Sequence, residues 1–167
     1  KIRIAAVKKE EQTKAAFNKA LAEVEMKALR AQMNPHFLFN CLNSINRYIV
    51  IKDTKNASNY LTKFSKLIRL ILENSAKENV SLTNEKELLK LYIEMESMRF
   101  ESKFTYDIET ENLNNSDEIM IPAMIIQPYI ENAIWHGLLN KDGDRHLQIR
   151  FRKQDELILE VTVEDNG

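Results

Sequence analysis

The sequence has one cysteine and only three glycines, and no glycine precedes Gly137. A single cysteine excludes an internal disulfide and a zinc site made of cysteines. Cys41 lies on an apolar helical face, where a buried structural thiol is expected rather than a reactive one. Because the chain before Gly137 has no glycine, it has no flexible break, which favours a long uninterrupted helix.

An excess of one charge and long apolar runs are also missing. Lys and Arg number 24 against 25 Asp and Glu, a net charge of -1, so neither a nucleic-acid surface nor a polybasic membrane patch is indicated. No apolar run approaches the roughly 20 residues of a membrane span, and we expect no signal peptide. We expect a soluble region of a longer protein, because Lys1 stands where an initiator methionine would be.

The first half of the chain has the pattern of a long helix. Apolar or small residues recur at alternating spacings of four and three, which is typical of a coiled coil or bundle. They are Phe17, Leu21, Val24, Ala28, Ala31, Pro35, Leu38, Leu42, Ile45 and Ile49. Asp53 is a cap residue for a second helix, whose apolar stripe runs from Tyr60 to Leu72 and ends near Ser75. Two helices cannot bury such stripes alone, so we predict a homodimeric four-helix bundle formed by a dimerisation region over residues 1–79.

Beyond about residue 79 the pattern changes to shorter elements. Glu85 to Phe100 is predicted to be a helix, and Pro122 is expected to open another, which Gly137 ends. Alternating apolar residues predict three strands, at Phe104, Tyr106 and Ile108, at Leu147, Ile149 and Phe151, and at Leu157, Leu159, Val161 and Val163. The last two strands pair as a hairpin, and helices beside a hairpin indicate an α+β sandwich over residues 80–167.

Pro35 and His36 stand out within the first helical pattern. A proline inside a helix removes a backbone hydrogen bond and costs roughly 3 kcal/mol, so it predicts a useful kink. A neutral imidazole on an exposed helix face is a nucleophile that can accept a phosphoryl group, and Asn40 lies one turn later, where it can orient a ligand or water. The alternative is a histidine at the bundle edge without a chemical role; Pro35 and the amides of Asn34 and Asn40 argue against it.

A second polar cluster lies within residues 127–137. Asn132 and His136 are four residues apart and share a helix face, with Glu131 beside them. An amide oxygen and a carboxylate are ligands suited to Mg²⁺ and its waters, which nucleotide phosphates require. The polar face of an ordinary surface helix explains the same pattern about equally well.

A third candidate is the stretch Glu164 to Gly167, which follows an apolar strand. Asp-Asn-Gly after a strand is usually a simple turn. In the functional interpretation, Asp165 is a carboxylate at a strand end that accepts a hydrogen bond from the amino group of a nucleotide base.

Taken in order, these stretches resemble the sensor histidine kinases of the LytS type, from about Ala28 to Gly167. The resemblance rests on residues 29–40 (LRAQMNPHFLFN), 92–100 (YIEMESMRF), 121–137 and 165–167 (DNG). Four motifs in this order and spacing are highly specific. Glu96 and Arg99 of the second motif also match the family, and their spacing fits a structural ion pair at least as well as a site.

The resemblance implies a helical dimerisation region followed by the first part of a Bergerat-type ATP-binding domain. It implies autophosphorylation from Mg²⁺-ATP and transfer to a response regulator, which in this family commonly carries a LytTR-type DNA-binding domain. The chain would then be a cytoplasmic part of an inner-membrane protein, with a sensory or membrane region upstream of Ala28. Since the rest of the Asp-x-Gly-x-Gly box and the lid would follow Gly167, we expect this stretch by itself to be inactive.

The resemblance also implies roles for individual residues. His36 corresponds to the phosphoacceptor, and Asn132 belongs to the N box, which holds Mg²⁺-ATP. Asp165 would contact adenine. The full set of candidates is His36, Asn40 and Glu131 for catalysis, Asn132, His136, Asp165 and Gly167 for nucleotide binding, and Asn132 for Mg²⁺.

Two alternatives remain open. One is a non-catalytic module for dimerisation and partner docking, built on the same helical hairpin. The other is a different Bergerat-fold ATPase, in which Glu131 activates water. Steady ATP turnover without phosphorylation of a histidine would favour the ATPase.

Overall fold

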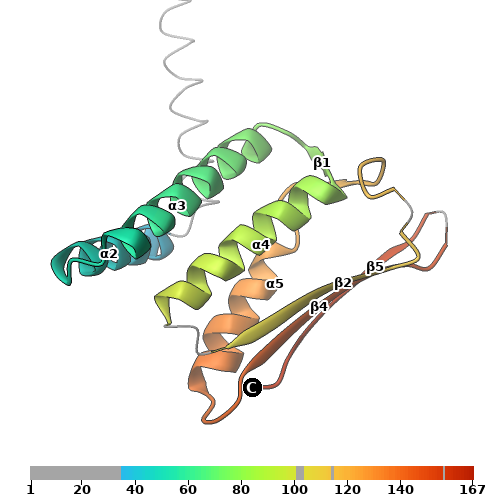
Figure 1. Ribbon diagram of the computed structural model, residues 1–167. Helices are drawn as coiled ribbons and strands as arrows, with labels where there is room; N and C mark the ends of the chain where they lie inside the picture. Colours follow the sequence, from blue (N-terminus) through green and yellow to red (C-terminus); the bar gives the residue numbers. More distant parts are fainter. Residues whose placement is uncertain (1–34, 101–103, 114, 156) are drawn as a thin grey trace, which may run out of the picture. The chain divides into compact units, whose positions relative to one another are not determined.

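The computed structural model describes residues 35–100, 104–113, 115–155 and 157–167 (Figure 1). Contacts between residues divide the chain into two compact units, one ending at Phe39 and the other running from Asn40 to Gly167. The heptad positions before Pro35 lie outside the described residues, so the predicted kink stays a prediction. No helix in the described part of the chain is long and apolar enough to cross a membrane.

Two helices form the first part of the structure, α2 (Pro35–Val50) and α3 (Thr54–Ser75). The chain turns between them at Lys52, which has a φ of 59°. Asp53 caps α3, because its Oδ1 accepts a hydrogen bond of 3.1 Å from the Asn56 N–H. The cap at Asp53 and the end at Ser75 are therefore confirmed.

Side chains of α2 and α3 form a small interior. The ring centroids of Tyr48 and Tyr60 are 6.1 Å apart, and Cys41 is fully buried. Burial raises the pKa of the Cys41 thiol to about 12, because the charged thiolate is poorly solvated there. The prediction of a buried, unreactive thiol is confirmed in its burial. Several apolar side chains stay exposed: Leu42, Ile49, Val50, Ile51, Leu61 and Leu72.

The third helix, α4 (Leu82–Arg99), begins earlier than predicted. Ser81 caps it, since the Ser81 Oγ accepts a hydrogen bond of 3.2 Å from the Asn84 N–H. Its buried residues include the consecutive Leu91, Tyr92 and Ile93, which point in different directions around the helix. This agrees with its place between α3 and the sheet (Figure 1).

The main sheet has three strands in the order β2 (Thr105–Glu111), β4 (His146–Lys153) and β5 (Leu159–Asp165). The antiparallel pairing of β4 with β5 confirms the predicted hairpin, and β2 pairs with β4 in parallel. The predicted start of the last strand at Leu157 is wrong. Leu157 is 95% exposed and lies in the turn, where its N–H bonds to Asp155 Oδ1 at 2.8 Å. Helices α4 and α5 lie on one side of this sheet, which agrees with the predicted α+β class (Figure 1).

The helix predicted to open at Pro122 begins later. Pro122 ends the short strand β3 (Met120–Pro122), which pairs antiparallel with β1 (Asn79–Ser81). Helix α5 (Gln127–Asn132) carries Pro128 in its first turn, where a proline fits because that N–H needs no helical partner. Pro122 fits the end of a short strand because a proline, which has no N–H to donate, is tolerated where the pairing with the neighbouring strand stops.

Gly137 does not end the helical path. A π-helical turn (Ala133–Gly137) follows α5, and a 3₁₀ turn (Leu138–Asn140) continues it. Gly137 has a φ of -83°, so its backbone does not need the left-handed conformation of a glycine cap. Glycine is found here because there is no room for a Cβ atom.

Candidate functional site

A cavity of about 860 Å³ lies between β3, α5 and β5. Its wall includes Asn132 and His136 from one motif and Asp165 from another, which are far apart in the sequence. The apolar part of the wall is made by Ile121, Pro122, Ile125, Ile126, Ala133, Val161 and Val163. An apolar cavity with a few convergent polar groups is the usual form of a small-molecule site.

The helical side of the cavity presents Asn132 and His136, one turn apart and both exposed. Tyr129, one turn earlier, also lines the cavity and is 65% exposed. Glu131 is not among the lining residues. Instead, its Oε1 accepts a hydrogen bond of 2.8 Å from Gln127 Nε2 along the same helix. The structure therefore brings together Asn132 and His136 as predicted, but not Glu131.

The strand side of the cavity presents the carboxylate of Asp165, which lies directly against Gly137. A Cβ atom added to Gly137 would lie 2.5 Å from Asp165 Cγ, closer than such atoms can approach. The Gly167 N–H donates a hydrogen bond of 3.0 Å to Asp165 Oδ1, and a Cβ on Gly167 would overlap the Gly137 backbone. The two glycines thus let the strand end and the helical turn approach closely. Sequence reasoning missed this role of Gly137, because nothing local distinguishes it from a helix-ending glycine.

Asn166 anchors the Asp-Asn-Gly turn to the start of β4. Its Oδ1 accepts a hydrogen bond of 2.9 Å from the His146 N–H, and its own N–H donates to the His146 carbonyl at 3.2 Å. Lys141 Nζ donates to the Asn166 carbonyl. With Asn166 fixed toward β4, Asp165 is held at the cavity wall.

An aromatic and charged cluster joins the end of α4 to the helical turn that carries His136. Arg99 Nη2 lies 2.5 Å from Glu96 Oε2, and its guanidinium stacks at 3.9 Å from the Phe100 ring centroid and 4.3 Å from that of Trp135. Burial raises the pKa of Glu96, and the Arg99 charge opposes that rise. Glu96 and Arg99 therefore form the ion pair that their spacing allowed, and Trp135 stacks against Arg99 and does not line the cavity.

The phosphoacceptor candidate lies elsewhere in the chain. His36 is exposed on α2, and Asn40 lies one turn later, half-buried. His36 belongs to the unit that ends at Phe39, whereas the cavity belongs to the unit that begins at Asn40. Their roles as phosphoacceptor and orienting residue remain predictions.

A metal ion would find few protein ligands in the described residues. Among them, no group of three or more His, Cys, Asp or Glu side chains could hold an ion. The amide oxygen of Asn132 is a suitable single ligand for Mg²⁺, which usually keeps several waters and binds substrate phosphates. The donor set therefore fits a Mg²⁺ ion that arrives with a nucleotide, rather than one held by the protein alone.

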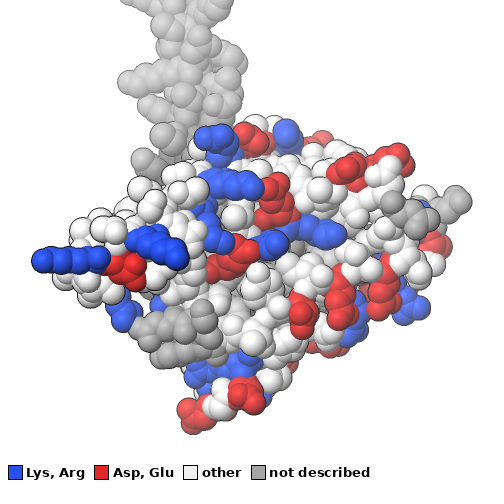
Figure 2. Space-filling model, viewed as in Figure 1, with Lys and Arg blue, Asp and Glu red and all other residues white. Residues whose placement is uncertain are grey.

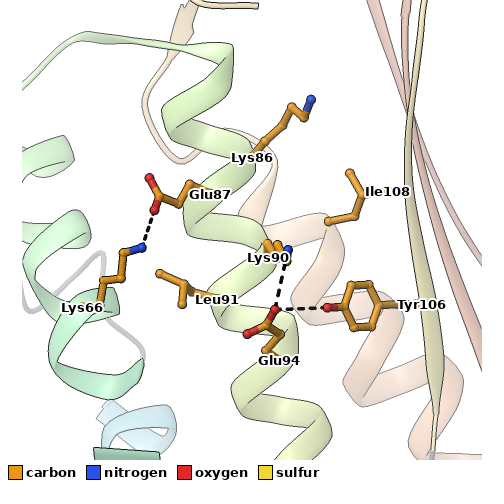
Figure 3. Close-up of a pocket in the computed structure, with 8 residues that line it drawn as sticks. All are labelled: Lys66, Lys86, Glu87, Lys90, Leu91, Glu94, Tyr106 and Ile108. Atoms are coloured by element: carbon orange, nitrogen blue, oxygen red, sulfur yellow. Dashed lines mark hydrogen bonds and ion pairs between the residues drawn. The ribbon is translucent and has the colours of Figure 1, made fainter. Parts of the chain in front are cut away.

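A second cavity, of about 690 Å³, lies between α3, α4 and β2 (Figure 3). Lys66 Nζ and Glu87 Oε1 form an ion pair of 2.6 Å across it, and the Tyr106 hydroxyl donates to Glu94 Oε1 at 3.4 Å. Its other lining residues are Lys86, Lys90, Leu91 and Ile108. None of the predicted site residues lines this cavity. Basic and acidic side chains also lie side by side on the face shown in Figure 2.

Comparison with known proteins adds independent information. Residues 24–104 match the family model described as histidine kinase. The chain is also similar to the "Sensor histidine kinase/phosphatase LytS" of Staphylococcus aureus strains MW2 and COL, each 29% identical over 150 residues. Each alignment covers 90% of this chain and 25% of the relative, so the chain spans about a quarter of the length of these curated relatives. These matches support the resemblance to LytS-type sensor histidine kinases that the four motifs carry.

Proposed function

We propose that the chain is the kinase region of a two-component sensor, which binds Mg²⁺-ATP between α5 and β5 and phosphorylates His36. One observation carries the proposal: Asn132, His136 and Asp165, from two separate motifs, line one cavity of about 860 Å³. A volume of this order is typical of a site for a drug-sized or nucleotide-sized molecule, about 300–1,000 Å³.

The lining residues suit the parts of a nucleotide. The Asn132 amide oxygen is a ligand for Mg²⁺, and the Asp165 carboxylate accepts a hydrogen bond from a base amino group. The apolar side chains of Ile126 and Val163 offer a surface for a flat base. Bound Mg²⁺-ATP supplies the phosphoryl group and the charge neutralisation that its transfer needs. The protein's part is to hold and orient the reactants.

The exposure of His36 supports its role as the acceptor, because a nucleophile must be reachable by the phosphoryl group. In this proposal, a neutral His36 nitrogen forms the new bond to phosphorus and ADP leaves. Asn40 helps to orient the imidazole. The phosphoryl group then passes to an aspartate of a response regulator, which carries a LytTR-type DNA-binding domain. A sensory region elsewhere in the protein supplies the signal.

The exposed apolar side chains of α2 and α3 support a homodimer. Leu42, Ile49 and Leu61 are each at least half exposed. Apolar area of this kind is stabilised when a second copy covers it, as in a four-helix bundle. Glu131, in contrast, does not line the cavity, which weighs against the ATPase alternative, in which this acid activates water.

Labelling with γ-labelled ATP and Mg²⁺ tests the proposal. The native protein should take up label that is lost in acid and survives base, and His36→Gln should abolish it. His146→Gln is the matched control, because His146 lies on β4 and does not line the cavity. Undiminished label in His36→Gln would refute the assignment of the acceptor. Nucleotide binding without any label would favour a scaffold or an ATPase.

A further inference from the structure

The position of the candidate nucleotide residues depends on where α5 begins. The residue at its N-cap is Ile126, which makes no side-chain capping bond. Two residues earlier, Met124 has a φ of 56°, a conformation that residues with a side chain rarely adopt. The turn before α5 is therefore unfavourable by itself, and another part of the molecule must hold it.

Glu85 meets this turn from α4. Its side chain is fully buried in the first turn of that helix, and Glu85 Oε2 accepts a hydrogen bond of 3.1 Å from the Met124 N–H. Burial raises the pKa of the Glu85 carboxyl, and the backbone N–H groups of Met124 and Ile126 oppose that rise. Glu85 thus holds the Met124 turn, directly before α5, from a neighbouring helix.

A purely space-filling role does not explain a carboxylate at this position. Burying a carboxylate is costly unless it is paired or hydrogen-bonded, and no ion pair to Glu85 is found in the described part of the chain. Glu96, the other buried acid of α4, does have a cationic partner in Arg99. The hydrogen bond that Glu85 does make is to the Met124 N–H, in the turn directly before α5.

We propose that Glu85 is a positioning residue for the nucleotide site: by accepting the Met124 N–H in the turn directly before α5, its side chain fixes Asn132 and His136 at the cavity wall. The proposal rests on the proposed function of the cavity. It predicts that a variant without this acceptor binds nucleotide more weakly than a control variant that is destabilised by the same amount.

Three variants of the native protein test this proposal. Glu85→Met removes the acceptor but keeps a similar volume, and Glu85→Gln keeps an oxygen that can accept the Met124 N–H. Leu88→Ala is the control, because Leu88 is equally buried one turn further along α4 and makes no bond to the Met124 turn. The probe is Mg²⁺ with a non-hydrolysable ATP analogue, measured by calorimetry beside a thermal melt of each variant.

We expect the Kd to rise about tenfold in Glu85→Met and less in Glu85→Gln, and to stay within about twofold in Leu88→Ala despite its lower melting temperature. Rescue by the glutamine distinguishes the lost acceptor from a general loss of stability. A Kd of Glu85→Met within about twofold of that of the unaltered protein would overturn the proposal. If Glu85→Met does not fold, Glu85→Leu, which also removes the acceptor, takes its place: a rise in Kd larger than that of Leu88→Ala supports the proposal, and a Kd within about twofold of that of the unaltered protein overturns it.

Amide hydrogen exchange separates this inference from the proposed function. Loss of the acceptor should speed exchange over residues 124–133 in Glu85→Met, and Leu88→Ala should not do so selectively. If the unaltered protein binds no ATP analogue, the nucleotide proposal fails, and exchange alone then decides whether Glu85 holds α5. Equal exchange of this segment in both variants would refute the role of Glu85.

Discussion

The helical hairpin and the α/β part of this chain bury their apolar residues to different extents. In α2 and α3, few apolar side chains are buried, among them Tyr60, Leu67 and Ile71, while Ile49 and Val50 are 59% and 70% exposed. In the α/β part, long side chains such as Phe151 and Ile134 are fully buried. The α/β part therefore has a well-buried core, whereas the hairpin leaves apolar side chains exposed, which agrees with the proposed dimer.

This difference agrees with the tasks proposed for the two regions, nucleotide binding and dimerisation. A binding cavity needs rigid walls, and the cavity beside α5 is built on a packed sheet and helix layer. A dimer interface needs exposed apolar area, which the hairpin has. Mutations in the α/β part should therefore change ligand binding or folding, and mutations in the hairpin should change association of the proposed dimer.

The largest expected effect is on the core of the sheet. Phe151→Ala should lower the free energy of unfolding by about 3–5 kcal/mol, because Phe151 is fully buried in β4 and a cavity would remain. Ile49→Ala in the hairpin should cost about 0.5 kcal/mol or less at concentrations that keep the chain monomeric. Urea unfolding measures both. Equal losses of unfolding free energy in the two variants would mean that the two regions are packed equally tightly.

Next in size is the contact between Gly137 and Asp165. Gly137→Ala should weaken binding of an ATP analogue by about 10- to 100-fold, because the new Cβ displaces the Asp165 carboxylate at a cost of about 1–3 kcal/mol. Gly143→Asn is the control: an added Cβ there meets nothing within 4 Å, and asparagine tolerates its φ of 86°. Unchanged affinity in Gly137→Ala would show that Asp165 does not need its present position.

The sequence predicted those features that local patterns determine. Alternating apolar residues predicted the β4–β5 hairpin, and Asp53 predicted the start of α3, because period and cap chemistry act within a few residues. The parallel pairing of β2 with β4 was not predicted, since alternation indicates which face of a strand is buried but not its partner. Pro122 was misplaced because proline fits both a helix start and a strand end.

The candidate site was predictable only in part. Asn132, His136 and Asp165 were selected from motifs, and the fold brings all three to one cavity. Glu131 was selected by adjacency to Asn132, but neighbouring helix residues point about 100° apart, and Glu131 bonds to Gln127 instead. Glu85 was missed, because an acid in the first turn of a helix normally interacts with the helix dipole at the surface.

The exposed hairpin face gives the third prediction. Ile49→Lys combined with Leu61→Lys should raise the dimer dissociation constant at least about tenfold, since each side chain loses roughly 1.5 kcal/mol or more of apolar burial. Sedimentation velocity measures the change. The melting temperature of the isolated monomer should hardly move, because both positions are exposed there. A dimer of unchanged strength would place the interface on another face.

The smallest expected effect concerns the interior of the hairpin. Burial raises the pKa of Cys41 from 9.0 to about 12, so the folded state keeps its proton at pH values where the unfolded thiol loses it. The stability from the neutral thiol is full below pH 9 and is lost as the pH rises toward 12. Between pH 8 and pH 10 the free energy of unfolding should therefore fall by about 1.4 kcal/mol more in the unaltered protein than in Cys41→Ala. Parallel pH profiles for the two proteins would show that solvent reaches the thiol and that the side chains around Cys41 are not tightly packed.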